Sequence, residues 1–115
     1  MSATFEPIAI VGRGCVLPGC LTPDALWQAV VSGRSLLSLT SPRKWGLTAV
    51  EERNGQLMGG YVTGFDNVFD PARHDLGGLD PMRLDPVVRW PLHAAREAMA
   101  EAGHPKAASD RFGVI

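Results

Sequence analysis

The apolar residues of this chain fall into short unbroken runs and longer segments with helical spacing. The first run is Ile-Ala-Ile-Val at residues 8–11, which ends at Gly12, and the last is Phe-Gly-Val-Ile at residues 112–115. Neither run alternates with polar residues, which is typical of strands covered on both faces of a mainly parallel sheet. We therefore predict that the two runs are neighbouring parallel strands joined by a right-handed crossover.

A first helix is predicted after residue 22. Thr22 can cap it, Pro23 suits its first position, and Asp24 complements the positive end of the helix dipole. Gly33 can supply a left-handed end. The residues with helical spacing in between are Leu26, Trp27, Val30 and Val31. We expect this apolar face to cover the sheet, with the Trp27 ring buried.

A second, longer helix is predicted to begin with Asp85 and Pro86, which repeat the cap and proline signature. Gly103 marks its end. The apolar residues at steps of three and four are Leu92, Ala95, Met99 and Ala102. Pro91 lies inside the segment, where it cannot donate to the Val87 carbonyl, so we expect either a kink or a later helix start.

The segment between the helices has no clear period. Residues 35–54 are predicted to be an irregular surface excursion in which Trp45 anchors inward while Arg43 and Lys44 are solvated. The two glycines in residues 59–62 permit a tight turn into a short extended stretch.

The order of strand, helix, irregular stretch, helix and strand indicates an α/β protein without internal repeats. A length of 115 residues allows one domain at most. Two strands alone would leave both sheet edges unpaired, so we expect residues 1–115 to be an incomplete piece of a larger α/β domain.

Composition and charge narrow the function classes. The chain is 45% hydrophobic and 20% charged, which is ordinary for a soluble globular protein. The net charge of −1 disfavours nucleic acid as a partner. Apolar runs are far shorter than the roughly 20 residues of a membrane helix, and the first residues lack a basic signal region, so we expect a cytoplasmic protein with no membrane contact.

The two cysteines, Cys15 and Cys20, are too few to staple a small secreted domain and are interpreted as free thiols. They share no zinc-site spacing with the histidines, so no metal is assigned. Cys15 has only Arg13 nearby in sequence to stabilise a thiolate, and we interpret both cysteines as structural.

The glycines of residues 12–17 follow a predicted strand, as in a dinucleotide-binding turn. Leu17 stands at the third glycine position and no helix begins there, so a plain tight turn is favoured. His93 is predicted to form a helix-surface pair with Glu97, and His74 and His104 to be solvated loop residues.

Three stretches carry a family pattern. They are IAIVGRGCVLPG at residues 8–19 with the Leu-Trp pair of the following helix, GGYVTGFDNVFD at residues 59–70, and residues 84–103 followed by residues 112–115. In order and spacing they resemble the N-terminal part of β-ketoacyl synthases of polyketide and polyunsaturated fatty acid synthases. Residues 71–82 lack the phenylalanine-rich motif usual in modular synthases, which leaves the subfamily open.

The resemblance implies a thiolase-like layered α/β fold with mainly parallel core strands and covering helices. It implies an acyltransferase that performs decarboxylative condensation of acyl thioesters on acyl carrier protein, in fatty acid or polyketide biosynthesis, as a homodimer or paired subunit. The catalytic cysteine and two histidines of the family lie C-terminal to the matched stretch, and Cys15 matches a cysteine that is not the nucleophile. No catalytic, cofactor-binding or metal-binding residue is therefore assigned, no cofactor is expected, and the chain alone is expected to be inactive.

Two alternatives stay open at this point. The chain could belong to a scaffold that resembles a chain-length factor and pairs with a complete synthase. A weaker alternative is a small nucleotide-binding domain built on Gly12 and Gly14. A cysteine followed by two spaced histidines beyond residue 115 would separate the enzyme from the scaffold.

Overall fold

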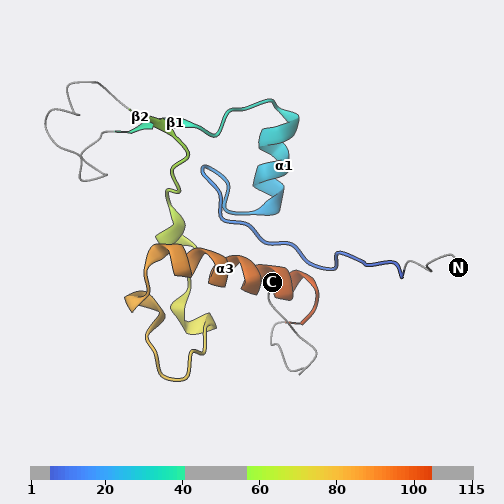
Figure 1. Ribbon diagram of the computed structural model, residues 1–115, viewed down its shortest axis with the longest axis vertical. Coiled ribbons are helices and arrows are strands. Elements are labelled where there is room, and N and C mark those ends of the chain that lie inside the picture. The colour runs from blue at the N-terminus through green and yellow to red at the C-terminus, as the bar shows by residue number, and fades with distance from the viewer. Residues whose placement is uncertain (1–5, 41–56, 105–115) are drawn as a thin grey trace, which may run out of the picture.

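The computed structural model of the chain describes residues 6–40 and 57–104. Two α-helices, a small sheet and three short 3-10 turns succeed one another along the chain (Figure 1). In order they are α1 (Pro23–Val31), β1 (Ser38–Thr40), β2 (Leu57–Gly59), η2 (Phe65–Asn67), η3 (Pro71–Arg73), η4 (Pro81–Arg83) and α3 (Pro86–Glu101). None of the helices within these ranges is long and apolar enough to cross a membrane.

Helix α1 begins and ends where the sequence predicts. The hydroxyl of Thr22 accepts a hydrogen bond from the Ala25 backbone N–H at 3.2 Å, and Pro23 occupies the first turn. Ser32 is the C-terminal cap, and Gly33 follows with a left-handed φ of 64°. These local signals are sufficient to fix the helix ends.

The predicted burial of the apolar face of α1 is wrong in the described structure. Trp27, Val30 and Val31 are all more than 60% exposed, and the helix buries Ala29 on another side. The reason is that the predicted parallel sheet does not form among the described residues. Residues 8–11 form no strand, so the large side chains of α1 have no partner layer among the described residues.

The sheet that does form is antiparallel and lies elsewhere. β1 pairs with β2 in the register Ser38↔Gly59, Leu39↔Met58 and Thr40↔Leu57. β1 falls in a stretch predicted to be irregular, and Gly59 ends a strand where a turn was predicted. A strand forms only where a neighbouring strand supplies hydrogen-bond partners. A short apolar run in the sequence does not show whether such a neighbour is present.

The expected pairing of residues 8–11 with residues 112–115 cannot be followed, since the second run lies outside the described residues. Ile8, Ile10 and Val11 are 87%, 86% and 70% exposed. The predictions for residues 43–45, the Trp45 anchor and the solvated Arg43 and Lys44, also lie outside the described residues.

Helix α3 begins at the predicted cap. The Asp85 carboxylate accepts a hydrogen bond from the Val87 backbone N–H at 2.9 Å, and Gly103, with a φ of 78°, follows the C-terminal cap. The helix is assigned continuously through Pro91, so the alternative of a later start is wrong. Pro91 is exposed to solvent, which can hydrate the carbonyl that lacks its helical donor.

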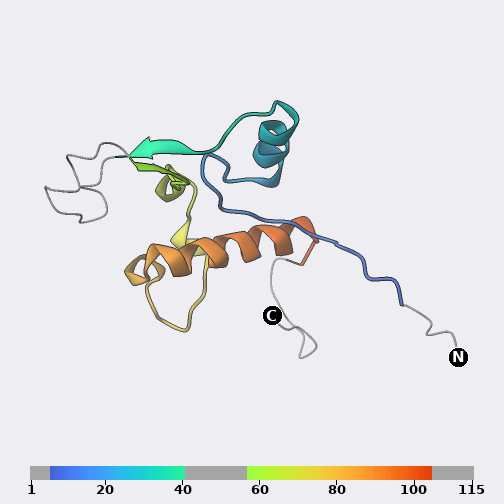
Figure 2. The ribbon, with the colours of Figure 1, turned by 45° about the horizontal axis from the view of Figure 1, so that its top comes forward.

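The residues that α3 buries most are not those with the predicted apolar spacing, of which Ala95 is exposed. The helix buries Arg89 and His93. A neighbouring row of alanines lies against the N-terminal segment, which passes between α1 and α3 (Figure 2). The alanines concerned are Ala94, Ala98 and Ala102. α3 therefore joins two packing regions that are far apart in the sequence.

Candidate functional site

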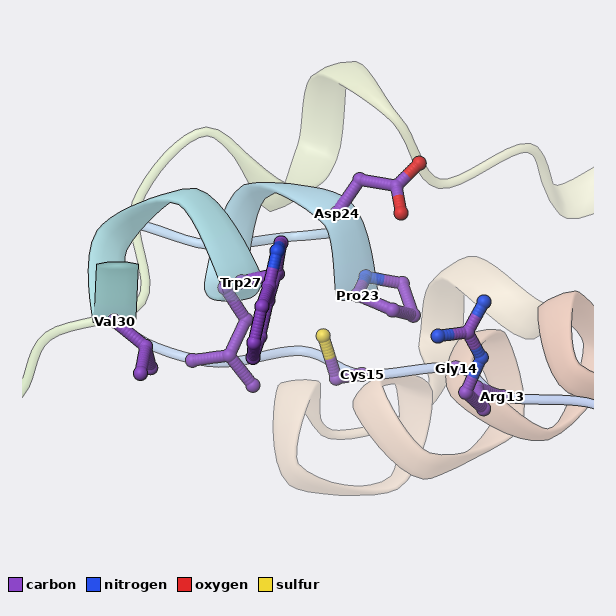
Figure 3. Close-up of a pocket in the computed structure, with 8 residues that line it drawn as sticks. Arg13, Gly14, Cys15, Pro23, Asp24, Trp27 and Val30 are labelled. Atoms are coloured by element: carbon purple, nitrogen blue, oxygen red, sulfur yellow. The ribbon is translucent and has the colours of Figure 1, made fainter. Parts of the chain in front are cut away.

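Residues 12–15 form a seam between the two helices. The chain is extended here, so successive side chains point to opposite sides. Gly12 and Gly14 face α3, whereas Arg13 and Cys15 line a hollow beside α1 (Figure 3). We call residues 12–15 the glycine seam.

The glycines of the seam are required by a close approach to α3. A Cβ on Gly12 would lie 1.9 Å from the carbonyl oxygen of Ala98, and a Cβ on Gly14 would lie 2.0 Å from that of Ala94. Carbon and oxygen atoms that are not bonded do not approach so closely, so only glycine fits at either position. The space above these glycines is filled by helix backbone, which disfavours the alternative of a phosphate-binding loop.

The predicted tight turn does not lie at these glycines but a few residues later. Leu17 and Cys20 exchange backbone hydrogen bonds of 2.9 and 3.1 Å around the Pro18-Gly19 pair. Gly19 has a left-handed φ of 67°, as the second central residue of a type II turn requires. The turn redirects the chain into α1.

Arg13 and Glu101 fasten the seam to the C-terminal end of α3. Nη2 of Arg13 lies 2.6 Å from Oε1 of Glu101, and the Arg13 backbone N–H donates to Oε2 of the same carboxylate. The side-chain hydrogen bond and then the backbone hydrogen bond from Arg13 lower the pKa of Glu101. A carboxylate near the negative end of a helix is otherwise unfavourable, so Arg13 compensates the helix dipole as well. No sequence pattern revealed this pair, because 88 residues separate its members.

The hollow beside the seam has a volume of about 580 Å³. Its lining is mostly apolar, and the Trp27 ring stands next to the sulfur of Cys15 (Figure 3). The lining residues are Arg13, Gly14, Cys15, Pro23, Asp24, Leu26, Trp27 and Val30. Such a lining can receive an apolar side chain or ligand group.

The Cys15 thiol is poorly suited to act as a nucleophile. Burial raises its pKa, and the neighbouring Cys20 raises it further. Arg13, the nearest cation in sequence, is already paired with Glu101. The thiol therefore stays protonated at neutral pH, whereas nucleophilic chemistry needs the thiolate. Cys20 is only 1% exposed.

The structure corrects two of the three histidine predictions. His93 is 6% exposed and meets the edge of Phe65 at 5.5 Å, whereas Glu97 pairs with another residue. His74 is half-buried and stacks on Phe69 at 5.0 Å. His104 is exposed, as predicted. The only sequence signal for this cluster is the spacing of Phe65 and Phe69, four residues apart.

Within the part of the chain that the structure describes, the seam and its hollow are a packing contact between the N-terminal segment and the two helices of an α/β protein. The model of the family described as Beta-ketoacyl synthase, N-terminal domain, matches residues 5–115. The chain belongs to this family, which implies a thiolase-like α/β fold, and the resemblance noted in the sequence is confirmed.

Several polyketide synthases are similar to the chain. Polyketide synthase GfsA of Streptomyces halstedii is 33% identical over 94% of the chain, and Highly reducing polyketide synthase 19 of Pyricularia oryzae is 36% identical over 85%. A mycocerosic acid synthase-like polyketide synthase of Mycobacterium tuberculosis is 33% identical over 95%. The chain spans only 2%, 4% and 6% of these relatives, in the order GfsA, synthase 19 and the mycobacterial protein. No solved structure gives a significant match.

Proposed function

We propose that the chain is the N-terminal portion of a β-ketoacyl synthase domain, an acyltransferase that condenses acyl thioesters with decarboxylation of the extender unit. The observation that carries the proposal is the family match over residues 5–115, together with about one-third identity to polyketide synthases. The acyl chains would be held on acyl carrier protein, within a larger synthase that works in polyketide or fatty acid biosynthesis in the cytoplasm.

In this proposal the chain supplies structural support for the synthase domain and none of its catalytic residues. Glycines place residues 12–14 directly on α3, and Arg13 pairs with Glu101 at the end of that helix. The raised pKa of the Cys15 thiol argues against its use as the acyl acceptor. We infer that the acyl-accepting cysteine and its histidine partners lie outside the matched stretch.

The exposed apolar side chains support a place inside a larger fold. Ile8 and Ile10 of the extended segment are more than 85% exposed, and the outer face of α1 is exposed as well. Exposed surface of this kind is characteristic of contact with another part of a protein. We propose that further core strands and helices of the synthase cover it, in a mainly parallel sheet, and that the domain pairs as a dimer.

The test uses the natural polypeptide that carries this sequence, incubated with acyl-loaded and malonyl-loaded carrier protein. Mass spectrometry should detect a β-ketoacyl product on the carrier, while the 115-residue chain alone should give none. Cys15→Ala should leave turnover unchanged. A folded natural polypeptide that forms no product, but raises the activity of a complete synthase paired with it, would support the scaffold instead.

A further inference from the structure

Residues 64–74 form a segment that closes against the first half of α3. Phe65 and Phe69 are its buried residues, at 5% and 6% exposure, and their rings lie 5.3 Å apart. From α3, the His93 ring meets both phenylalanines, at 5.5 and 6.4 Å. His74, which belongs to the segment itself, stacks on the Phe69 ring. We call residues 64–74 the latch segment.

Two ion pairs tie the latch segment to α3 at the margin of this cluster. Arg89 pairs with Asp66 at 3.1 Å, and Arg73 pairs with Glu97 at 2.8 Å. The Arg89 guanidinium carbon also lies 5.7 Å from the centre of the Phe69 ring. The aromatic centre of the latch is therefore already in contact with one permanent positive charge.

We propose that the latch segment is released by acid, because uncharged His74 and His93 close the aromatic cluster and a proton on either ring opens it. The inference does not depend on the proposed function. It rests on the position of two imidazoles within one aromatic cluster that joins two elements. Segments that open locally in this way are drawn from parts of a protein that few contacts hold.

The charges around the cluster decide the direction of the effect. Burial is the main influence on both rings and disfavours the imidazolium, so the pKa of His74 and the pKa of His93 lie below their usual value. Arginines add to this for both rings, whereas Glu97 favours a charged His93 and Asp70 a charged His74. Glu97 is already paired with Arg73, which weakens its attraction. The charged and titratable groups around the cluster are Asp66, Asp70, Arg73, Arg89, Arg96, Glu97 and the two histidines.

A favourable contact between a protonated His74 and the Phe69 face does not reverse this conclusion. A cation over an aromatic ring is stabilised by roughly 0.5–1 kcal/mol at exposed sites. The Phe69 ring already faces Arg89, and the Arg73 and Arg96 charges oppose a further cation. His93 is 6% exposed, so its imidazolium would be largely desolvated.

The sign follows from linkage. Because the pKa of each ring is lower in the closed state, the open state takes up protons more readily. The closed latch keeps its full stability above the usual histidine pKa of about 6.5 and loses it as the pH falls through the closed-state pKa. Opening increases about tenfold for each unit of difference between the open and closed pKa of a ring.

The test is amide hydrogen exchange of the natural polypeptide between pH 7.5 and 5, read by mass spectrometry and corrected for intrinsic rates. Peptides covering residues 64–74 should lose protection several-fold on acidification. Peptides from α1 should not change. His74→Phe and His93→Phe remove the titrating rings but keep an aromatic contact, so the double variant should lose the pH response. His104→Gln, at an exposed histidine beyond α3, is the matched control and should keep it.

Exchange of the imidazole carbon-bound hydrogen in the unaltered protein gives a second readout that needs no variant. The His74 and His93 rings should titrate below the usual histidine pKa of about 6.5, in the pH range where the latch peptides open. Latch protection that is constant down to pH 5 would overturn the proposal. So would titration of both rings at or above the usual histidine pKa of about 6.5, or a pH response that persists in the folded double variant.

Discussion

Replacing Gly14 by alanine tests one of the two close approaches of the glycine seam to the backbone of α3. The new Cβ would lie 2.0 Å from the carbonyl oxygen of Ala94, 2.9 Å from its carbonyl carbon and 3.1 Å from the backbone nitrogen of Ala98. All three atoms belong to the backbone of α3, so no side-chain rotation can relieve the overlap. Ordinary carbon to carbonyl-oxygen contacts are roughly 3.3 Å or longer, so the seam must move away from α3 by more than about 1 Å.

The size of the effect follows from two opposing contributions. Overpacking of a closely packed site usually costs about 1–3 kcal/mol and sometimes more. Alanine also restricts the unfolded chain, which stabilises the protein by about 0.4–1 kcal/mol where the native backbone accepts it. Because the contact is with rigid backbone, we expect Gly14→Ala to lower the free energy of unfolding by about 2 kcal/mol. The melting temperature should then fall by on the order of 10 °C.

Thermal and urea unfolding of the 115-residue chain, followed by circular dichroism at the helix band, measures this change. Gly33→Ala is the control, since a Cβ on Gly33 would meet no atom within 4 Å and only the left-handed φ of 64° opposes alanine there. That conformation costs about 1 kcal/mol. The pKa of Glu101 should also rise in Gly14→Ala, because Arg13 moves away with the seam. A Gly14→Ala protein as stable as the unaltered chain would refute the described seating of the seam on α3.

Three further outcomes are expected. In the 115-residue chain alone, Trp27→Ala should cost only about 1 kcal/mol because the side chain is 63% exposed there, whereas Phe69→Ala, at 6% exposure, should cost about 3–5 kcal/mol. Equal losses of melting temperature would contradict the burial pattern. Asp85→Ala should destabilise α3 by about 1 kcal/mol, since it removes the acceptor for the Val87 N–H, and an unchanged urea midpoint would count against that cap. Iodoacetamide should label Cys15 only at a higher pH than it labels the unfolded chain, because burial raises the pKa of the thiol; labelling at a lower pH would show an activated thiolate.

An aspartate followed by proline occurs at three places in the chain, and it begins a 3-10 turn at two of them and an α-helix at the third. Asp70, Asp80 and Asp85 each precede a proline and each accept a hydrogen bond from the backbone N–H two residues on. Only the third begins an α-helix. The 3-10 turn η4 stops in part because Asp85 itself precedes a proline, which keeps its backbone extended, with ψ at 141°. Only the third signature was recognised from the sequence, because the segment between the two predicted helices has no clear period.

Family membership was also accessible from sequence, because three stretches carry the family pattern in order and spacing, and the family model matches residues 5–115. The role of the glycines was not. A sequence does not distinguish a glycine that makes a turn from a glycine that allows a helix backbone to come close. Only the position of α3 separates the two interpretations. The Arg13 and Glu101 pair was missed for the same reason.

The helix ends were determined by the sequence itself, because a cap such as Thr22 or a left-handed Gly103 acts within a few residues of its own position. Tertiary structure alone decided which faces are buried. The apolar face of α1 stays exposed because nothing among residues 6–40 and 57–104 covers it, while the polar residue His93 is buried because two phenylalanines lie against it. Burial and strand pairing depend on what another part of the chain offers, and a local pattern carries no information about that partner.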